Sequence, residues 1–123
     1  MQSNLFVMNN PKAKELIQKV VNDIEANAGI EVIAEKLTAI RAIALEVEDP
    51  LVVKTLRIIK EKIEEDESLE FEIEIEVPED DLEEYEEPEN HLTHLLNLIS
   101  DSDNKYNRDE IMWYRTAIWD EIY

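Results

Sequence analysis

SLEFEIEIEV, at residues 68–77, is the stretch of sequence that decides the predicted fold. Side chains along a β-strand point alternately to the two faces of the sheet, so every second residue shares a face. In this stretch one face is apolar and the other carries four glutamates. The apolar face would hold Leu69, Phe71, Ile73, Ile75 and Val77, and the other face Glu70, Glu72, Glu74 and Glu76. This alternation is typical of a half-buried strand.

The negative charge of the chain is concentrated around this stretch. Residues 61–90 hold 17 Asp and Glu against one Lys, a net charge of −16, whereas the whole chain of 123 residues has a net charge of −19. Residues 1–60 are balanced, with 8 acidic and 8 basic side chains. One quarter of the chain therefore carries most of the charge imbalance.

Helices are predicted on both sides of the acidic stretch. Apolar residues recur at three- and four-residue steps over residues 11–28, 30–47 and 50–63, as on the core-facing side of a helix. Shorter helical patterns follow residue 90. Gly29, the only glycine, is expected to end the first helix in a left-handed conformation. Side chains that can accept hydrogen bonds from the first-turn amides mark the helix starts. We expect such N-caps at Asn10, Asp49, Asn90 and Asn107, with Pro11 and Pro50 at first helical positions.

The predicted fold class is α+β and mostly helical, with about five helices and one amphipathic acidic strand. A lone strand leaves its backbone groups unpaired, so residues 68–77 need a partner. The candidates are the apolar segment Leu5–Met8, a second copy of the chain, or a target protein. The length predicts a single domain over residues 1–123. Its parts are a helical region (1–66), the acidic strand and loop (67–90), and a C-terminal helix pair (91–123).

Composition argues against several classes of function. The chain has no cysteine, and its N-terminal residues contain no signal peptide or membrane span, so we expect a cytoplasmic, soluble protein. Its strong acidity disfavours direct binding to nucleic acid or to an anionic membrane. A chain with one glycine has no glycine-rich phosphate loop, and no serine has a recognisable base partner. We therefore expect a protein that is not an enzyme and has no cofactor.

Two short motifs partly resemble metal sites. Residues 101–109 begin like a calcium loop, but Lys105, Tyr106 and Met112 stand where an oxygen ligand, a glycine and a bidentate glutamate belong. His91 and His94 could share a helix face, yet no third ligand has a recognisable spacing. We predict an inter-helix turn for the first motif, a partly exposed histidine pair for the second, and no metal site.

Aromatic residues gather near the C-terminus. Trp113, Tyr114, Trp119 and Tyr123 recur at helical spacing, which is typical of a core stripe. Apolar residues nevertheless cover more than half of the helix circumference, and aromatics are common interface anchors. Core alone and core plus interface both remain open, with Trp113, Trp119 and Tyr123 as candidate interface residues.

Two functions fit the concentration of acidic residues at 61–90. Single-sign fields of this density are avoided unless they steer a partner, so we expect a regulator that binds a basic, nucleic-acid-binding surface of another protein. The composition is similar to that of small acidic proteins that mimic DNA, inhibit restriction or CRISPR systems, or neutralise nuclease toxins. The alternative is a dimeric adaptor or secretion-type chaperone that uses its apolar and aromatic surfaces, with acidity serving only solubility. The glutamate row also has a purely structural interpretation, as a solvated strand edge whose charge blocks aggregation. The expected partner-binding residues are Glu70, Glu72, Glu74, Glu76, Glu79, Asp80, Asp81, Glu83, Glu84, Glu86 and Glu87.

Overall fold

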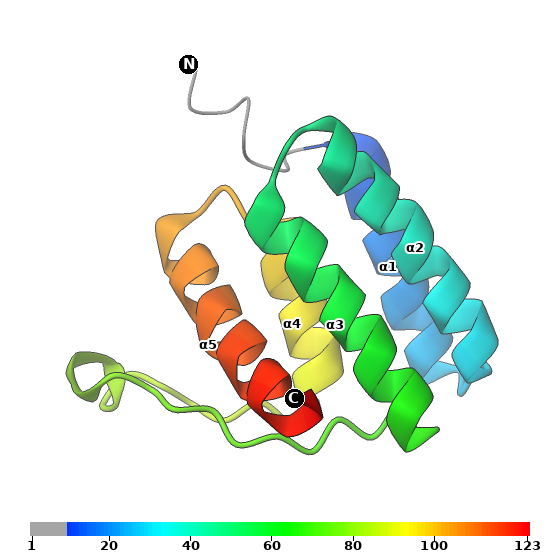
Figure 1. Ribbon diagram of the computed structural model, residues 1–123. Coiled ribbons are helices and arrows are strands. Elements are labelled where there is room, and N and C mark those ends of the chain that lie inside the picture. Colours follow the sequence, from blue (N-terminus) through cyan, green and yellow to red (C-terminus); the bar gives the residue numbers. More distant parts are fainter. Residues whose placement is uncertain (1–9) are drawn as a thin grey trace.

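The computed structural model describes residues 10–123, which fold into five α-helices (Figure 1). Neighbouring helices pack in a closed circuit, in which α1 contacts α2, α2 contacts α3, α3 contacts α5, α5 contacts α4, and α4 contacts α1. Each helix therefore buries one stripe against two neighbours. The helices are α1 (Pro11–Glu25), α2 (Ile30–Glu46), α3 (Pro50–Asp66), α4 (His91–Ser100) and α5 (Lys105–Ile122), with a single 3₁₀ turn, η2 (Glu79–Asp81), between α3 and α4.

The predicted α+β fold class is wrong, because no strand forms within residues 10–123. The stretch at 68–77 is extended, but it lies across the ends of the helices instead of in a sheet (Figure 1). Most of its apolar side chains pack against the helical core. Every second side chain is therefore buried or partly buried, as in a strand, although no sheet is present in residues 10–123. The proposed pairing segment Leu5–Met8 lies outside the described residues. We call residues 67–90 the acidic arm.

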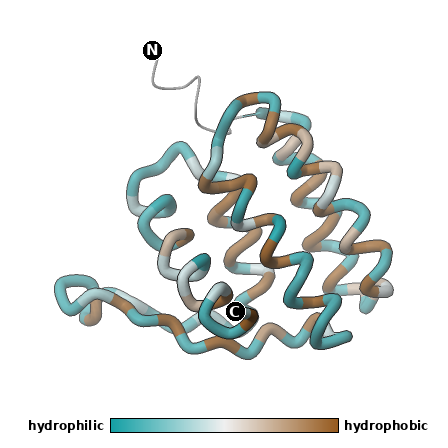
Figure 2. Tube along the Cα trace, in the orientation of Figure 1, coloured by the Kyte–Doolittle hydropathy of each residue, from teal (hydrophilic) through white to brown (hydrophobic). Residues whose placement is uncertain are grey.

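The side-chain alternation along the arm was predicted correctly. Phe71 is buried, and Leu69, Ile73 and Ile75 are partly buried against the core. Glu70, Glu72, Glu74 and Glu76 are all exposed. Figure 2 shows the apolar positions as short segments alternating with hydrophilic ones along the arm.

Local chain signals explain most helix ends. The Asn10 side chain accepts hydrogen bonds from the amides of Lys12 and Ala13, and Pro11 opens α1 as predicted. The prediction for Gly29 is wrong, since it has φ −67° and is the N-cap of α2. Asn27 takes the left-handed conformation instead, with φ 59°, which asparagine tolerates better than most residues.

The two C-terminal helices also begin at asparagines. Asn90 caps α4 by accepting a hydrogen bond from the amide of Thr93, as predicted. The predicted cap of α5 is three residues too late: Asn104 accepts from the amides of Tyr106 and Asn107. Asn107 instead donates its side-chain amide to the Asp101 carbonyl, so residues 101–104 form the expected inter-helix turn.

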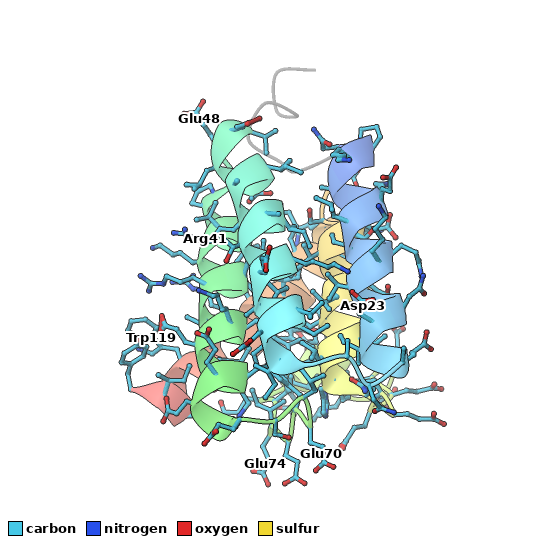
Figure 3. All side chains as sticks on the ribbon, turned by 90° about the vertical axis from the view of Figure 1, so that its right-hand side faces the viewer. Asp23, Arg41, Glu48, Glu70, Glu74 and Trp119 are labelled. Carbon is cyan, nitrogen blue, oxygen red and sulfur yellow. The ribbon has the colours of Figure 1, made fainter. Side chains whose placement is uncertain are left out.

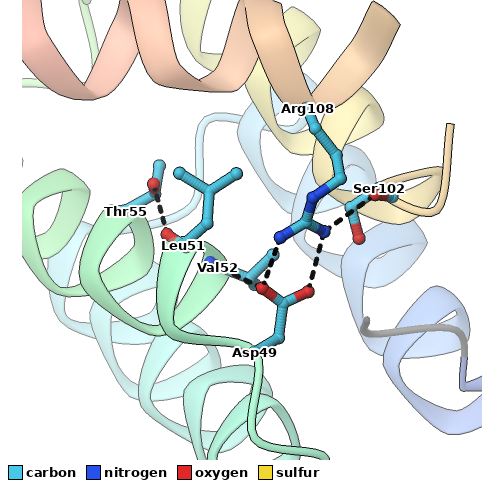
Figure 4. A network of polar contacts seen from close by, with 6 residues as sticks. All are labelled: Asp49, Leu51, Val52, Thr55, Ser102 and Arg108. Carbon is cyan, nitrogen blue, oxygen red and sulfur yellow. Dashed lines mark hydrogen bonds and ion pairs between the residues drawn. The ribbon is translucent and has the colours of Figure 1, made fainter. Parts of the chain in front are cut away.

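A buried ion pair joins two helix turns that are far apart in sequence (Figure 4). Asp49 is fully buried, caps α3 through the amide of Val52, and accepts two hydrogen bonds, at 2.9 and 3.0 Å, from the Arg108 guanidinium. Arg108 also donates to the Ser102 carbonyl. Hydrogen bonding to Asp49 raises the pKa of Arg108 above its ordinary value. The turn before α3 is thereby fixed to the start of α5.

Candidate protein-binding surface

The acidic arm brings all predicted partner-binding residues onto one segment. Of these carboxylates only Asp81 is half-buried, and the others are exposed. Glu70 and Glu74 project together from one end of the molecule (Figure 3). Among the described residues, no Lys or Arg forms an ion pair with any of them. Their charge is therefore available to a partner.

The first limb of the arm, which is the part before η2, is anchored by the contact between Phe71 and Lys62. Lys62 is almost completely buried, and its Nζ lies 5.3 Å from the centroid of the Phe71 ring. It also donates to Asp66 at 2.9 Å and to Glu121 at 3.3 Å. Burial alone would lower the pKa of Lys62, but these two carboxylates outweigh it and raise the pKa above its ordinary value. One buried cation thus joins the ends of α3 and α5 beneath the arm.

The second limb of the arm, which is the part after η2, returns to the bundle and contacts it through an aromatic ring. Tyr85 packs edge-on against Trp113, with ring centroids 6.5 Å apart. Directly after the arm, Nδ1 of His91, the first residue of α4, is hydrogen-bonded to the hydroxyl of the buried Tyr114 in α5 at 2.7 Å. Burial raises the pKa of Tyr114, so this phenol stays neutral and able to donate. Both limbs are therefore attached to the helices.

The two histidines have separate partners. Nε2 of His94 lies 2.6 Å from a carboxylate oxygen of Glu110, whereas His91 contacts Tyr114. Burial lowers the pKa of His91, and the charge of Glu87 opposes that shift. Within residues 10–123 no group of three histidine, cysteine or acidic side chains is placed to hold a metal ion.

An open groove of about 1170 Å³ runs between the arm and α5. Its apolar part includes Phe71, Ile73, Ile75, Trp113 and Ala117, and no Lys or Arg lines it. A groove with this chemistry suits an extended segment that presents apolar and basic side chains. Its acidic lining consists of Glu70, Glu72, Glu74, Glu76, Glu87, Glu89, Asp120 and Glu121.

The basic side chains of α3 do not neutralise the arm. Lys54 and Lys60 form no ion pair with any described residue, and Arg57 pairs only with Glu61, at 3.6 Å on the surface. The one lysine of α3 that does compensate acids is Lys62. The exposed carboxylates of the acidic arm are therefore not neutralised by ion pairs with α3.

The predicted interface aromatics occupy two different places. Trp113 lines the groove beside the arm. Trp119 and Tyr123 stack on each other, with ring centroids 4.3 Å apart, and are 46% and 66% exposed. Tyr123 also donates its hydroxyl to Glu61. Trp113 therefore lines the same groove as Glu70, Glu72, Glu74 and Glu76, whereas Trp119 and Tyr123 do not line it.

Sequence reasoning missed the supports of the arm. Nothing in the sequence indicated that Lys62 is buried beside Phe71 and bonded to Glu121, a residue 59 positions away. The only local signal was the i,i+4 spacing of Lys62 and Asp66, which predicts an ion pair on one helix face. Contacts between the ends of different helices have no such signal.

None of the helices in residues 10–123 is long and apolar enough to cross a membrane. Comparisons of the chain with protein-family models, with curated proteins and with solved structures give no match.

Proposed function

We propose that this protein is a non-enzymatic acidic regulator that binds a basic, nucleic-acid-binding surface of another protein through its acidic arm. The observation that carries the proposal is the set of exposed arm carboxylates that form no ion pair with a Lys or Arg in residues 10–123, held on an arm that is attached to the helices near both ends. Supports of this kind reduce the ordering cost of binding, because less chain freedom is lost when the partner arrives.

The spacing of the glutamates suits the imitation of a phosphate backbone. An extended chain rises about 3.3 Å per residue, which sets Glu70, Glu72 and Glu74 about 6.5–7 Å apart along the exposed face. A single-sign row of this kind steers a basic partner and increases its association rate by about 10–10³-fold, an effect that weakens with salt. We infer that these carboxylates occupy the positions where the partner binds phosphates.

The arm also offers its backbone to a partner. Residues 71–77 form no backbone–backbone hydrogen bond with any described residue, although they are extended and held by Phe71. An extended segment of the partner could add to this edge as a strand does in β-augmentation. Like charges directly opposite each other are destabilising, so a partner segment with alternating basic residues fits and a second acidic arm does not.

The test is affinity capture from cell lysate, followed by a salt gradient. We expect basic nucleic-acid-binding proteins to elute at moderate salt. The test variant replaces Glu70, Glu72, Glu74 and Glu76 with Gln, which should remove this capture and slow association of the captured protein about tenfold or more. A matched control replaces four exposed helix acids without ion pairs, Glu25, Glu31, Glu35 and Glu46, and loses the same charge. Equal capture by both variants would contradict a role for the acidic row.

The adaptor or chaperone function remains a second proposal, supported by the exposed stacked pair Trp119 and Tyr123. Apolar docking persists at high salt, because screening weakens charge pairs and not hydrophobic burial. Partners that stay bound through the salt gradient and are lost on Trp119→Ser would favour this function over the acidic regulator.

A further inference from the structure

A second cleft, of about 280 Å³, lies between α3 and α5. It is lined by Lys54, Arg57, Ile58, Arg115, Thr116 and Trp119, so no acidic residue takes part in it. Three of the 12 basic residues of a strongly acidic chain meet here around an aromatic ring. The cleft therefore combines positive charge with an apolar wall.

The cations of this cleft are poorly compensated within the molecule. Lys54 and Arg115 have no ion pair among the described residues. Arg57 reaches Glu61 at 3.6 Å, an exposed pair of the kind that contributes little. Lys54 and Arg57 are also exposed, so the cleft presents positive charge toward solvent.

The complementary surface on the same chain is the tip of the acidic arm. The tip begins with η2 and lies beyond α5, away from the bundle (Figure 1). Leu82 is 55% exposed there, although it is a large apolar side chain. Its neighbours in sequence are Asp80, Asp81, Glu83 and Glu84. The tip therefore offers one apolar side chain surrounded by carboxylates.

We propose that the cleft between α3 and α5 binds the arm tip of a second copy of this chain. Leu82 would pack against the exposed ring of Trp119, while the flanking carboxylates would pair with Lys54, Arg57 and Arg115. A small free anion would satisfy the cations but leave the apolar wall uncovered. The acidic tip matches both parts of the cleft, which is the reason for choosing it as the occupant.

The net charge of −19 on each molecule opposes this contact at long range. At about 0.15 M salt the Debye length is about 8 Å, so charges farther apart than that are largely screened while touching pairs remain. The contact is therefore weak at low salt, strongest at intermediate salt, and weaker again when about 1 M salt screens the ion pairs and leaves only the apolar part of the contact. Tip and cleft are different surfaces, so the association is head to tail.

The test is sedimentation velocity of the purified chain alone, so its result does not depend on the partner of the proposed function. We expect the protein to associate between micromolar and millimolar concentration at about 0.15 M salt. Leu82→Asp in the tip should weaken association about tenfold or more, because burying a leucine side chain contributes about that factor to a binding constant. Arg115→Glu in the cleft should weaken it about tenfold or more as well, because it places a carboxylate against the carboxylates of the tip. If Arg115→Glu does not fold, the exposed Lys54→Glu takes its place.

A mixture of the two variants separates this proposal from other modes of association. The Leu82→Asp protein keeps its cleft and the Arg115→Glu protein keeps its tip, so together they should form a one-to-one pair that neither forms alone. Leu45→Asp, at a position 52% exposed on α2, and Lys12→Glu, on α1, are matched controls that should associate like the parent. Monomeric behaviour of the parent at millimolar concentration would overturn the proposal. So would failure of the mixed variants to pair, or inorganic phosphate changing Trp119 fluorescence without any self-association.

Discussion

Replacement of Phe71 with Ala should release the acidic arm while leaving the helical bundle folded. Phe71 is the one buried residue of the arm, at 6% exposure, and its ring contacts the Lys62 ammonium at 5.3 Å. Residues 71–77 have no backbone–backbone hydrogen bonds with the described residues to hold them in place. The attachment of the first limb therefore depends on a few apolar side chains.

The magnitude follows from the burial of that ring. A Phe→Ala change in a packed core costs about 3–5 kcal/mol. Ordering of the backbone costs about 1–2 kcal/mol per residue, so seven ordered residues leave little net attachment once the ring is gone. The loss to the whole protein is limited to the attachment energy of the arm, because the arm can detach alone. Leu92→Ala, at a fully buried position in α4, costs about 2–5 kcal/mol. The bundle bears this whole cost, because α4 cannot detach alone as the arm can.

Backbone order parameters from NMR relaxation are the appropriate measurement. Over residues 71–77 we expect values near ~0.85 in the parent and below ~0.6 in Phe71→Ala. The thermal midpoint of the bundle, followed by circular dichroism, should fall less than in Leu92→Ala. The reasoning is refuted if the arm stays rigid in Phe71→Ala, or if that variant unfolds as completely as Leu92→Ala does.

Two further predictions concern buried polar groups. Arg108→Met removes the guanidinium that pairs with the buried Asp49 carboxylate and should cost about 3–5 kcal/mol in urea unfolding. The double variant with Asp49→Asn should lose less than the sum of the single changes, and additive losses would contradict coupling. Burial lowers the pKa of His91, so the unfolded chain binds more protons below about pH 6.5 and stability should fall as the pH decreases from there. Thermal melts across that range should show a smaller decrease for His91→Gln, and an equal decrease would contradict the assignment.

Features set by neighbouring residues could be predicted from the sequence. Asn10 with Pro11 and Asp49 with Pro50 begin helices because a side-chain acceptor and a fixed φ favour the first turn. The alternation of residues 68–77 was also interpreted correctly as one buried and one exposed face. Both signals depend only on residues within a few positions of each other.

The error in fold class has a physical cause. A period of two reports that every second side chain is buried, but not what buries it. Helix ends can cover an apolar row as well as a second sheet layer can, and exposed backbone groups can bond to water instead of to a neighbouring strand. The prediction for Gly29 failed because another residue could take the same role: Asn27, two residues earlier, has the left-handed conformation.

Contacts between distant residues had no sequence signal. Arg108 lies 59 positions from Asp49, and only the packing of α3 against α5 brings them together. The basic cleft has the same origin, since Lys54 and Arg115 belong to those two helices. Asp49 was predicted as a helix cap, which is correct but incomplete. Its second role required the tertiary structure.

The placement of charge explains how a small bundle can carry so acidic a segment. Like charges crowded on a compact surface destabilise the folded state by mutual repulsion. On the extended arm, glutamates two residues apart are about 6.5–7 Å from each other and face solvent, which keeps their repulsion small. The arm contributes one buried residue to the core, so its exposed residues can change with little effect on the helices. The stability of the bundle and the proposed recognition would thereby depend on different parts of the chain, and the Phe71→Ala variant tests whether the arm can be released without unfolding the bundle.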